Sequence, residues 1–194
     1  QKEELQKIAE TIPDLKERII QLRDSFYNRM EERTLSRRGA VAKCNTPKVR
    51  IDIVSLSDKK QFLANFRCII QKDKGYDKAL QKIETTCFPQ RPGNFKELYH
   101  SILDDFQRIR KEENSELGFD GTFSNMIKSL TDEQISSLEV LVPGDMIDVE
   151  YKPNGSSNFK SIVNASAGQK TTAVLTFILS QAGCPLLLDQ PEDD

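Results

Sequence analysis

Residues 164–194, NASAGQKTTAVLTFILSQAGCPLLLDQPEDD, carry the strongest indication of the fold and function of this chain. Small residues surround Gly168, an apolar run typical of a helix follows from about Lys170 to Gln181, and three leucines then lead into Asp189. A glycine-containing loop before a helix predicts an anion site, because the first N–H groups of a helix are unpaired and its dipole is positive there. An acid that follows a buried strand lies where α/β sheets bind ligands and metals.

This order of motifs resembles the C-terminal lobe of an ABC-type ATPase head of the SMC, RecF and RecN kind, which carries coiled-coil arms. The sequence SAGQ at 166–169 is similar to the ABC signature, usually SGGQ, and LLLD at 186–189 is similar to Walker B. The ending DQPEDD looks closest to the bacterial TrlF-like ATPases, which are often fused to a PHP phosphoesterase domain. The resemblance covers residues 164–194 and implies a mixed α/β, helix-rich fold, the C-terminal half of a P-loop ATPase head.

In such heads two lobes meet head to tail with ATP between them. The resemblance therefore implies that the signature contacts, in trans, the γ-phosphate held by the Walker A loop of another subunit. The implied contacts are the Ser166 hydroxyl and the Gly168 N–H, because small residues let the backbone approach a phosphate closely. Ala167 replaces the usual first glycine. Gln169 and Lys170 each add a donor at the helix start.

The resemblance also implies that Asp189 holds Mg²⁺, a cation that prefers oxygen ligands. ABC enzymes usually place a glutamate next, but this chain has Gln190, which cannot accept a proton. Three explanations fit. The head binds ATP and hydrolyses it slowly, Glu192 supplies the missing carboxylate, or Gln190 is an engineered change.

The sequence contains no GxxxxGK[ST] motif, which would cradle phosphates through its backbone and its lysine. We therefore expect the chain by itself neither to bind ATP tightly nor to hydrolyse it. The expected partners are the Walker A lobe of the same full-length protein, of which this chain would be a piece, and a second head in an ATP-bound homodimer. The expected cofactors are ATP and Mg²⁺.

Composition and charge set further limits. The chain has 194 residues and a net charge of −2, but residues 1–112 carry 24 basic and 17 acidic side chains, whereas residues 113–194 carry 4 and 13. The first part can therefore meet a polyanion more readily than the second. The four cysteines are far apart, which indicates free thiols in a reducing cytoplasm. No apolar run is long enough for a membrane span.

Residues 1–37 contain a heptad pattern, and the resemblance implies that they form the end of a coiled-coil arm. Their apolar residues are spaced alternately three and four positions apart, as in a heptad seam: Leu5, Ile8, Ile12, Leu15, Ile19, Leu22 and Phe26. Pro13 predicts a kink or a restart of the helix near Thr11–Pro13. An ordinary amphipathic helix that packs on its own domain is the alternative.

A basic region from Arg33 to Arg50 follows, and Gly39 is expected to end the helix. Such a cluster at the base of a coiled coil can hold DNA or RNA phosphates. A solvated linker is the alternative, because no aromatic residues lie among these cations to stack on bases.

The remainder, 38–194, is the expected ATPase lobe, with a helical subdomain over about 58–142. Strands are expected at 49–53, 147–151 and 159–163, and a loop at 113–121. Capping residues predict helices after Asp58, Asn94 and Thr131, and a shorter helix is expected over 76–84. His100, the single histidine, is expected at the surface or in packing.

Two other classes of function remain open. A coiled-coil scaffold or interaction module would use the heptad seam alone and would be indifferent to nucleotide. A metal-dependent nuclease would use the terminal acids, but nuclease centres usually add a nearby lysine or histidine, and the stretch 189–194 has neither.

Overall fold

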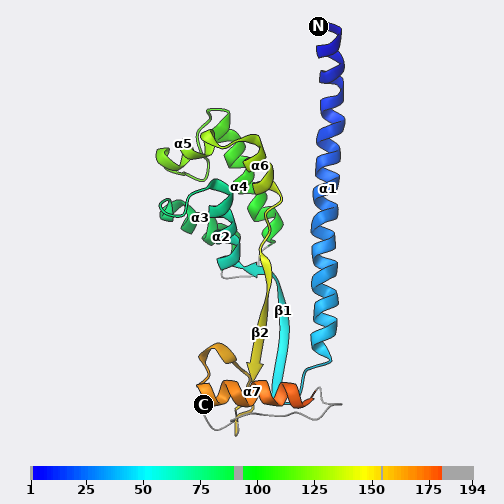
Figure 1. Cartoon of the computed structure of the whole chain (residues 1–194), viewed down its shortest axis with the longest axis vertical. Coiled ribbons are helices and arrows are strands. Elements are labelled where there is room, and N and C mark those ends of the chain that lie inside the picture. Colours follow the sequence, from blue (N-terminus) through cyan, green and yellow to red (C-terminus); the bar gives the residue numbers. More distant parts are fainter. Residues whose placement is uncertain (1, 90–93, 154, 181–194) are drawn as a thin grey trace. The chain divides into compact units, whose positions relative to one another are not determined.

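The computed structural model describes residues 2–89, 94–153 and 155–180. The chain combines many helices with a small antiparallel sheet, so the predicted mixed α/β, helix-rich class is confirmed (Figure 1). The helices are α1 (Lys2–Ala42), α2 (Lys59–Ile70), α3 (Asp77–Cys87), α4 (Phe95–Arg110), α5 (Gly121–Ser129), α6 (Asp132–Glu139) and α7 (Ala167–Ser180). The sheet has the order β1 (Val49–Asp58), β2 (Gly144–Tyr151) and β3 (Lys160–Ser161).

The chain divides into two compact units. The helical unit comprises residues 1–28 and 56–144, and the sheet unit comprises residues 29–55 and 145–194. Both α1 and β1 run through the two units. The helices expected over 58–142 all lie within the helical unit.

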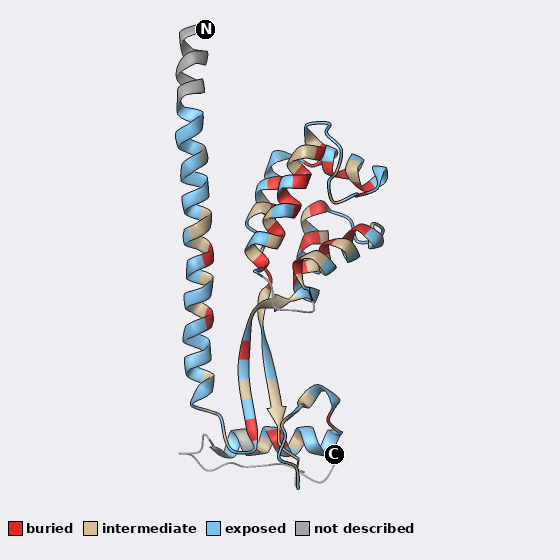
Figure 2. Ribbon diagram, turned by 180° about the vertical axis from the view of Figure 1, so that it is seen from behind, coloured by how far each residue is buried: buried red, intermediate tan, exposed pale blue. Residues whose placement is uncertain are grey.

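The helical unit is built around an aromatic core. Phe62 of α2 is fully buried and makes edge-on contacts with Phe95 and Tyr99 of α4, at ring-centroid distances of 5.5 and 5.2 Å. A second aromatic group joins Phe106 of α4 to Phe123 of α5. Figure 2 shows buried residues gathered on the inner sides of these helices, as their apolar periodicity predicts.

Local capping explains where several helices begin. Asp58 accepts a hydrogen bond from the Gln61 N–H, and Thr131 forms the predicted capping box with Gln134. The side chain of Asn94 makes no cap bond, so the capping pair expected there is wrong. Helix α5 was not predicted, although Asp120 caps it by accepting from the Phe123 N–H.

Helix α1 continues through Pro13, so of the two expected outcomes at Thr11–Pro13, a kink or a restart, the restart is wrong. A proline removes one intrahelical bond, but a long helix can propagate on both sides of it. The helix also runs through Gly39 to Ala42, beyond the expected end. Ile12, Leu15, Ile19 and Leu22 of the heptad seam are 43 to 62% exposed, whereas Tyr27 is buried against the helical core.

The sheet is antiparallel throughout. The Lys152 N–H donates to the Lys48 carbonyl at one end of the β1–β2 pair, and β2 pairs with β3 in the register Tyr151–Lys160. Gly155, at φ +78°, provides the left-handed conformation that the turn before β3 requires. The strand expected at 159–163 is mostly wrong, because only Lys160–Ser161 pairs, and a 3₁₀ turn follows over Ile162–Asn164.

Among the described residues, no helix has the length and apolar character needed to cross a membrane.

Candidate functional site

The start of α7 is held by two reciprocal hydrogen bonds. The Gln169 N–H donates to the Ser166 hydroxyl at 3.4 Å, and the Ser166 N–H donates to the Gln169 side-chain oxygen at 3.0 Å. These are the bonds of a capping box, which satisfies two otherwise unpaired N–H groups. Helix α7 therefore begins at Ala167, within the predicted signature and three residues before the predicted start at about Lys170.

The signature stretch lies at the surface while its flanks are anchored. Ser166, Ala167, Gly168, Gln169 and Lys170 are all exposed, whereas Ala165 and Ala173 are buried. A β-carbon added at Gly168 would meet nothing within 4 Å. A large group can therefore approach this backbone closely without steric hindrance from the described residues.

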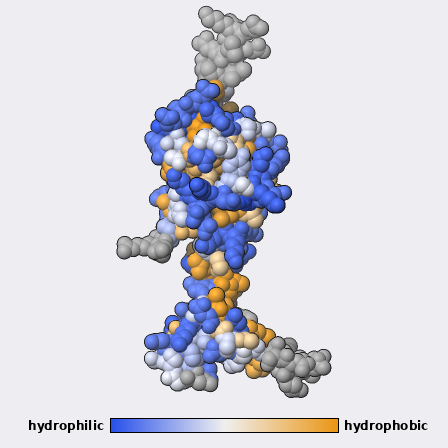
Figure 3. Space-filling view, turned by 90° about the vertical axis from the view of Figure 1, so that its left-hand side faces the viewer, coloured by the Kyte–Doolittle hydropathy of each residue, from blue (hydrophilic) through white to orange (hydrophobic). Residues whose placement is uncertain are grey.

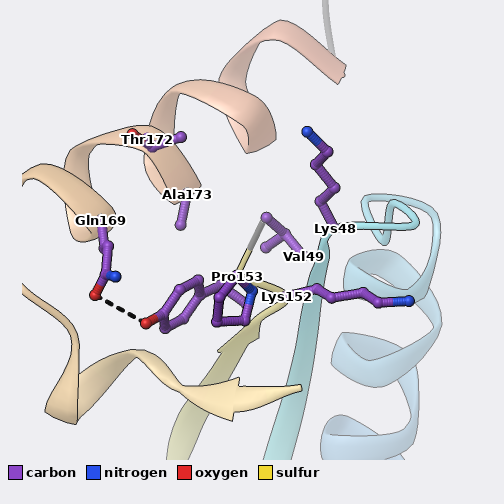
Figure 4. A pocket seen from close by; sticks show the side chains of 8 residues that line it. Lys48, Val49, Lys152, Pro153, Gln169, Thr172 and Ala173 are labelled. Carbon is purple, nitrogen blue, oxygen red and sulfur yellow. Dashed lines mark hydrogen bonds between the residues drawn. The ribbon is translucent and has the colours of Figure 1, made fainter. Parts of the chain in front are cut away.

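Tyr151, at the end of β2, also contacts the start of α7. Its hydroxyl donates to the Gln169 side-chain oxygen at 2.9 Å, across 18 residues of chain. The dashed line at Gln169 in Figure 4 marks this hydrogen bond. The sequence placed Tyr151 in a strand but contained no signal for this contact, because strand alternation does not say which helix lies opposite.

A cavity of about 340 Å³ lies beside this contact. Its lining comes from the start of β1, the end of β2 and the first turns of α7 (Figure 4): Lys48, Val49, Tyr151, Lys152, Pro153, Gln169, Thr172 and Ala173. The sequence had placed Lys48 in the basic region and had given no role to Lys152. Only the pairing of their strands brings the two lysines together.

A second, apolar groove of about 370 Å³ lies in the sheet unit. Hydrophobic side chains from the sheet, the 3₁₀ turn, α1 and α7 line it: Val41, Val49, Ile51, Ile147, Val149, Ile162, Ala173 and Val174. Ile147 is 66% exposed and Val174 is 50% exposed. Figure 3 shows hydrophobic surface gathered at the strands, in contrast to the mainly hydrophilic surface of the helices.

Much of the predicted basic region is engaged within the sheet unit. The Asp145 carboxylate is 3% exposed and accepts from Arg37 at 2.9 Å and from the Thr34 hydroxyl at 3.0 Å, with Arg33 at 3.9 Å. Arg38 donates to the Ile53 carbonyl at 2.7 Å.

Other cations of the basic region contact an aromatic ring or are exposed to solvent. The Arg50 guanidinium lies 3.9 Å from the centre of the Phe159 ring. Lys43 and Lys48 are exposed. The sequence could not show an aromatic partner for these cations, because Phe159 is more than one hundred positions away from Arg50.

His100 packs in the helical unit, edge-on to Tyr27 at a ring-centroid distance of 6.1 Å. Burial lowers its pKa below the usual 6.5, the Arg23 charge lowers it further, and Asp104 opposes these effects. Burial also raises the pKa of the Cys87 thiol to about 12, so this cysteine stays protonated at neutral pH. Cys44, Cys68 and Cys87 are free thiols.

The remaining predicted site residues, Asp189, Gln190 and Glu192, lie outside the described residues. The structure therefore brings together Ser166–Lys170, Tyr151 and the two lysines, and leaves the predicted metal ligand unplaced. Within the ranges that the structure describes, no group of three or more His, Cys, Asp or Glu side chains could hold a metal ion.

Comparisons with protein-family models, curated proteins and solved structures found no match to this chain.

Proposed function

We propose that this chain is the C-terminal lobe of an ABC-type ATPase head, which contributes the signature at Ser166–Gln169 and the Walker B stretch at 186–189 to a composite ATP site. The observation that carries the proposal is the start of α7. Its signature residues are exposed together, a β-carbon at Gly168 would meet nothing within 4 Å, and two capping bonds join Ser166 to Gln169.

The donors at this helix start fit a phosphate. No carboxylate lies among residues 165–170, and the unpaired N–H groups of the first turn favour an anion. The Ser166 hydroxyl accepts from the Gln169 N–H and keeps its own proton to donate. Gly168 permits close approach of the backbone, and Lys170 adds positive charge at the rim. ATP would supply the γ-phosphate that these groups contact.

The Walker B stretch completes the proposal from the sequence alone. Asp189 would hold Mg²⁺ through oxygen, the ligand type that this ion prefers. Gln190 would orient a water without accepting its proton, and Glu192 would serve as the alternative carboxylate. Slow hydrolysis follows where Gln190 acts without Glu192, because general-base catalysis needs a group that takes up a proton, and the Glu192 carboxylate would supply such a group.

Two surfaces supply contacts for the expected partners. The apolar groove of the sheet unit has the character of a permanent interface, and we assign it to the Walker A lobe of the full-length protein. The exposed seam of α1 is assigned to the second helix of a coiled-coil arm. A protein of this kind would act in DNA or RNA maintenance or in defence, with Lys43 and Lys48 among the exposed cations of the basic region.

The exposed seam also favours a second candidate, a coiled-coil scaffold without nucleotide chemistry. Helix α1 leaves Leu15 and Leu22 more than half exposed, and such a stripe needs a partner whether or not ATP binds. The two candidates differ in one respect that can be measured. Only the ATPase lobe changes its state of association with nucleotide.

The test is ATP- and Mg²⁺-dependent dimerisation of the full-length protein, followed by light scattering. Ser166→Arg places a bulky cation where the phosphate would lie, and Asp189→Ala removes the proposed metal ligand. We expect both changes to abolish dimers that form with ATP. Ser157→Arg, at an exposed serine in the same unit, adds the same charge elsewhere and should leave the dimers intact.

Association that is indifferent to ATP and to both substitutions would favour the scaffold. The 194-residue chain by itself is expected to release no phosphate from ATP, since it has no P-loop motif.

A further inference from the structure

The cavity between the ends of β1 and β2 and the first turns of α7 has the walls of a small-molecule site. Val49 and Ala173 are 2% and 4% exposed and form its apolar base, together with the Tyr151 ring and Pro153. Gln169 and Thr172 contribute polar groups. Its volume of about 340 Å³ is in the range of sites that bind small organic ligands.

The charge of this cavity is positive. Lys48 and Lys152 line it, and no aspartate or glutamate among the described residues does. The two residues are held side by side, because the Lys152 N–H donates to the Lys48 carbonyl at 2.7 Å. Within the described part of the chain, neither lysine forms an ion pair.

Figure 4 shows the two lysine side chains leaving the strand ends on the side away from Gln169, in different directions. Each is a long, flexible stem that can bring its ammonium group to a common anion at the mouth of the cavity. Two like charges that share no counter-ion repel each other, and an anion between them removes that repulsion.

We propose that this cavity binds a small organic anion with a flat ring, of the size and chemistry of a nucleoside monophosphate. The phosphate lies between Lys48 and Lys152 at the mouth. The ring lies against the apolar wall of Tyr151 and Pro153. Adenosine contacts only the apolar wall and inorganic phosphate contacts only the two lysines. Each therefore binds more weakly than a nucleoside monophosphate, which makes both sets of contacts.

The cavity is connected to the signature by direct contacts. Gln169 lines the cavity, accepts from the Tyr151 hydroxyl and holds Ser166 through the two capping bonds. A ligand that moves Tyr151 or Gln169 therefore changes the environment of Ser166. Any effect on ATP-dependent dimers rests on the proposed function, whereas ligand binding itself does not.

The experiment is an NMR titration of the 194-residue chain with AMP, without ATP and without Mg²⁺. We expect shifts of the backbone amides of Val49, Lys152 and Gln169, and of Ser166 through its bonds to Gln169. The variant Lys48→Gln/Lys152→Gln should bind AMP at least about tenfold more weakly, since it removes both charges that the phosphate meets. The control Lys43→Gln/Lys160→Gln makes the same change in net charge at exposed lysines outside the cavity and should bind AMP as the unchanged chain does.

The proposal is wrong if AMP shifts none of these amides, if the Lys48/Lys152 variant binds as tightly as the unchanged chain, or if inorganic phosphate binds as tightly as AMP. Because this test contains no second head and no ATP, its failure leaves the dimerisation test unaffected. A failure of the dimerisation test likewise leaves AMP binding to be decided by these shifts.

Discussion

The helical unit and the sheet unit differ in how far their large hydrophobic side chains are buried. In the helical unit, large side chains such as Phe62, Phe66 and Tyr99 are fully buried among one another. In the sheet unit, Ile147 and Val163 are 66% and 74% exposed, and a buried carboxylate with its arginines forms a main contact between α1 and β2. The helical unit therefore buries its large side chains in one core, whereas the sheet unit leaves several large hydrophobic side chains exposed.

The largest expected effect tests the aromatic core. Phe62→Ala should lower the free energy of unfolding by about 3–5 kcal/mol, because it removes a buried ring and leaves a cavity between α2 and α4. Ile147→Ala, at an exposed position, should change it by less than about 0.5 kcal/mol. Urea denaturation followed by circular dichroism measures both. Equal losses would remove the contrast between the two units.

The next effect tests the polar contact of the sheet unit. Asp145→Ala should lower the free energy of unfolding by about 2 kcal/mol, because Arg37 and the Thr34 hydroxyl lose a buried hydrogen-bond acceptor. Water can replace part of this hydrogen bonding at the Arg37 guanidinium. Asp148→Ala removes an exposed carboxylate from the same strand and should be nearly neutral. Hydrogen exchange of β2 amides, compared between the two variants, locates the loss. An Asp145→Ala chain with unchanged β2 protection would contradict the role given to this carboxylate.

The smallest effect sharpens the description of the helical core. The Tyr99 hydroxyl donates to the Leu138 carbonyl at 2.9 Å, whereas the buried Tyr27 hydroxyl has no hydrogen-bond partner among the described residues. Tyr99→Phe should therefore lower the free energy of unfolding by about 1 kcal/mol, whereas Tyr27→Phe should leave it unchanged or raise it by about 0.5 kcal/mol. Thermal unfolding of the two variants measures the difference. A larger loss for Tyr27→Phe would mean that its hydroxyl has a partner.

Local patterns predicted much of the helical unit. The capping residues Asp58 and Thr131 predicted the starts of α2 and α6. The buried residues Phe62, Phe66 and Ile70 of α2 lie at helical spacing. Helix α5 was missed because it is short and opens with Gly121, which is a poor helix former. The strand expected at 159–163 failed because alternation alone does not ensure a partner along its whole length.

The candidate site was predictable only in part. The residues predicted a helix start next to Gly168, and α7 does begin there, at Ala167, with Ser166 accepting from the Gln169 N–H. Tyr151, Lys152 and Asp145 had no such signal. Each acts through a contact with a residue far away in the chain, and single-sequence patterns carry information only over a few positions.

The sequence by itself determined the helical periods, the caps at Asp58 and Thr131, and the small residues at 165–168, because these depend on bonds between neighbours within about one turn. Only the tertiary structure decided that Asp145 accepts a hydrogen bond from Arg37 and that Tyr151 donates one to Gln169. It also decided that Lys48 and Lys152 line the same cavity. These contacts require strand pairing and packing between distant segments. Such contacts form when the chain folds as a whole, so no local stretch contains them.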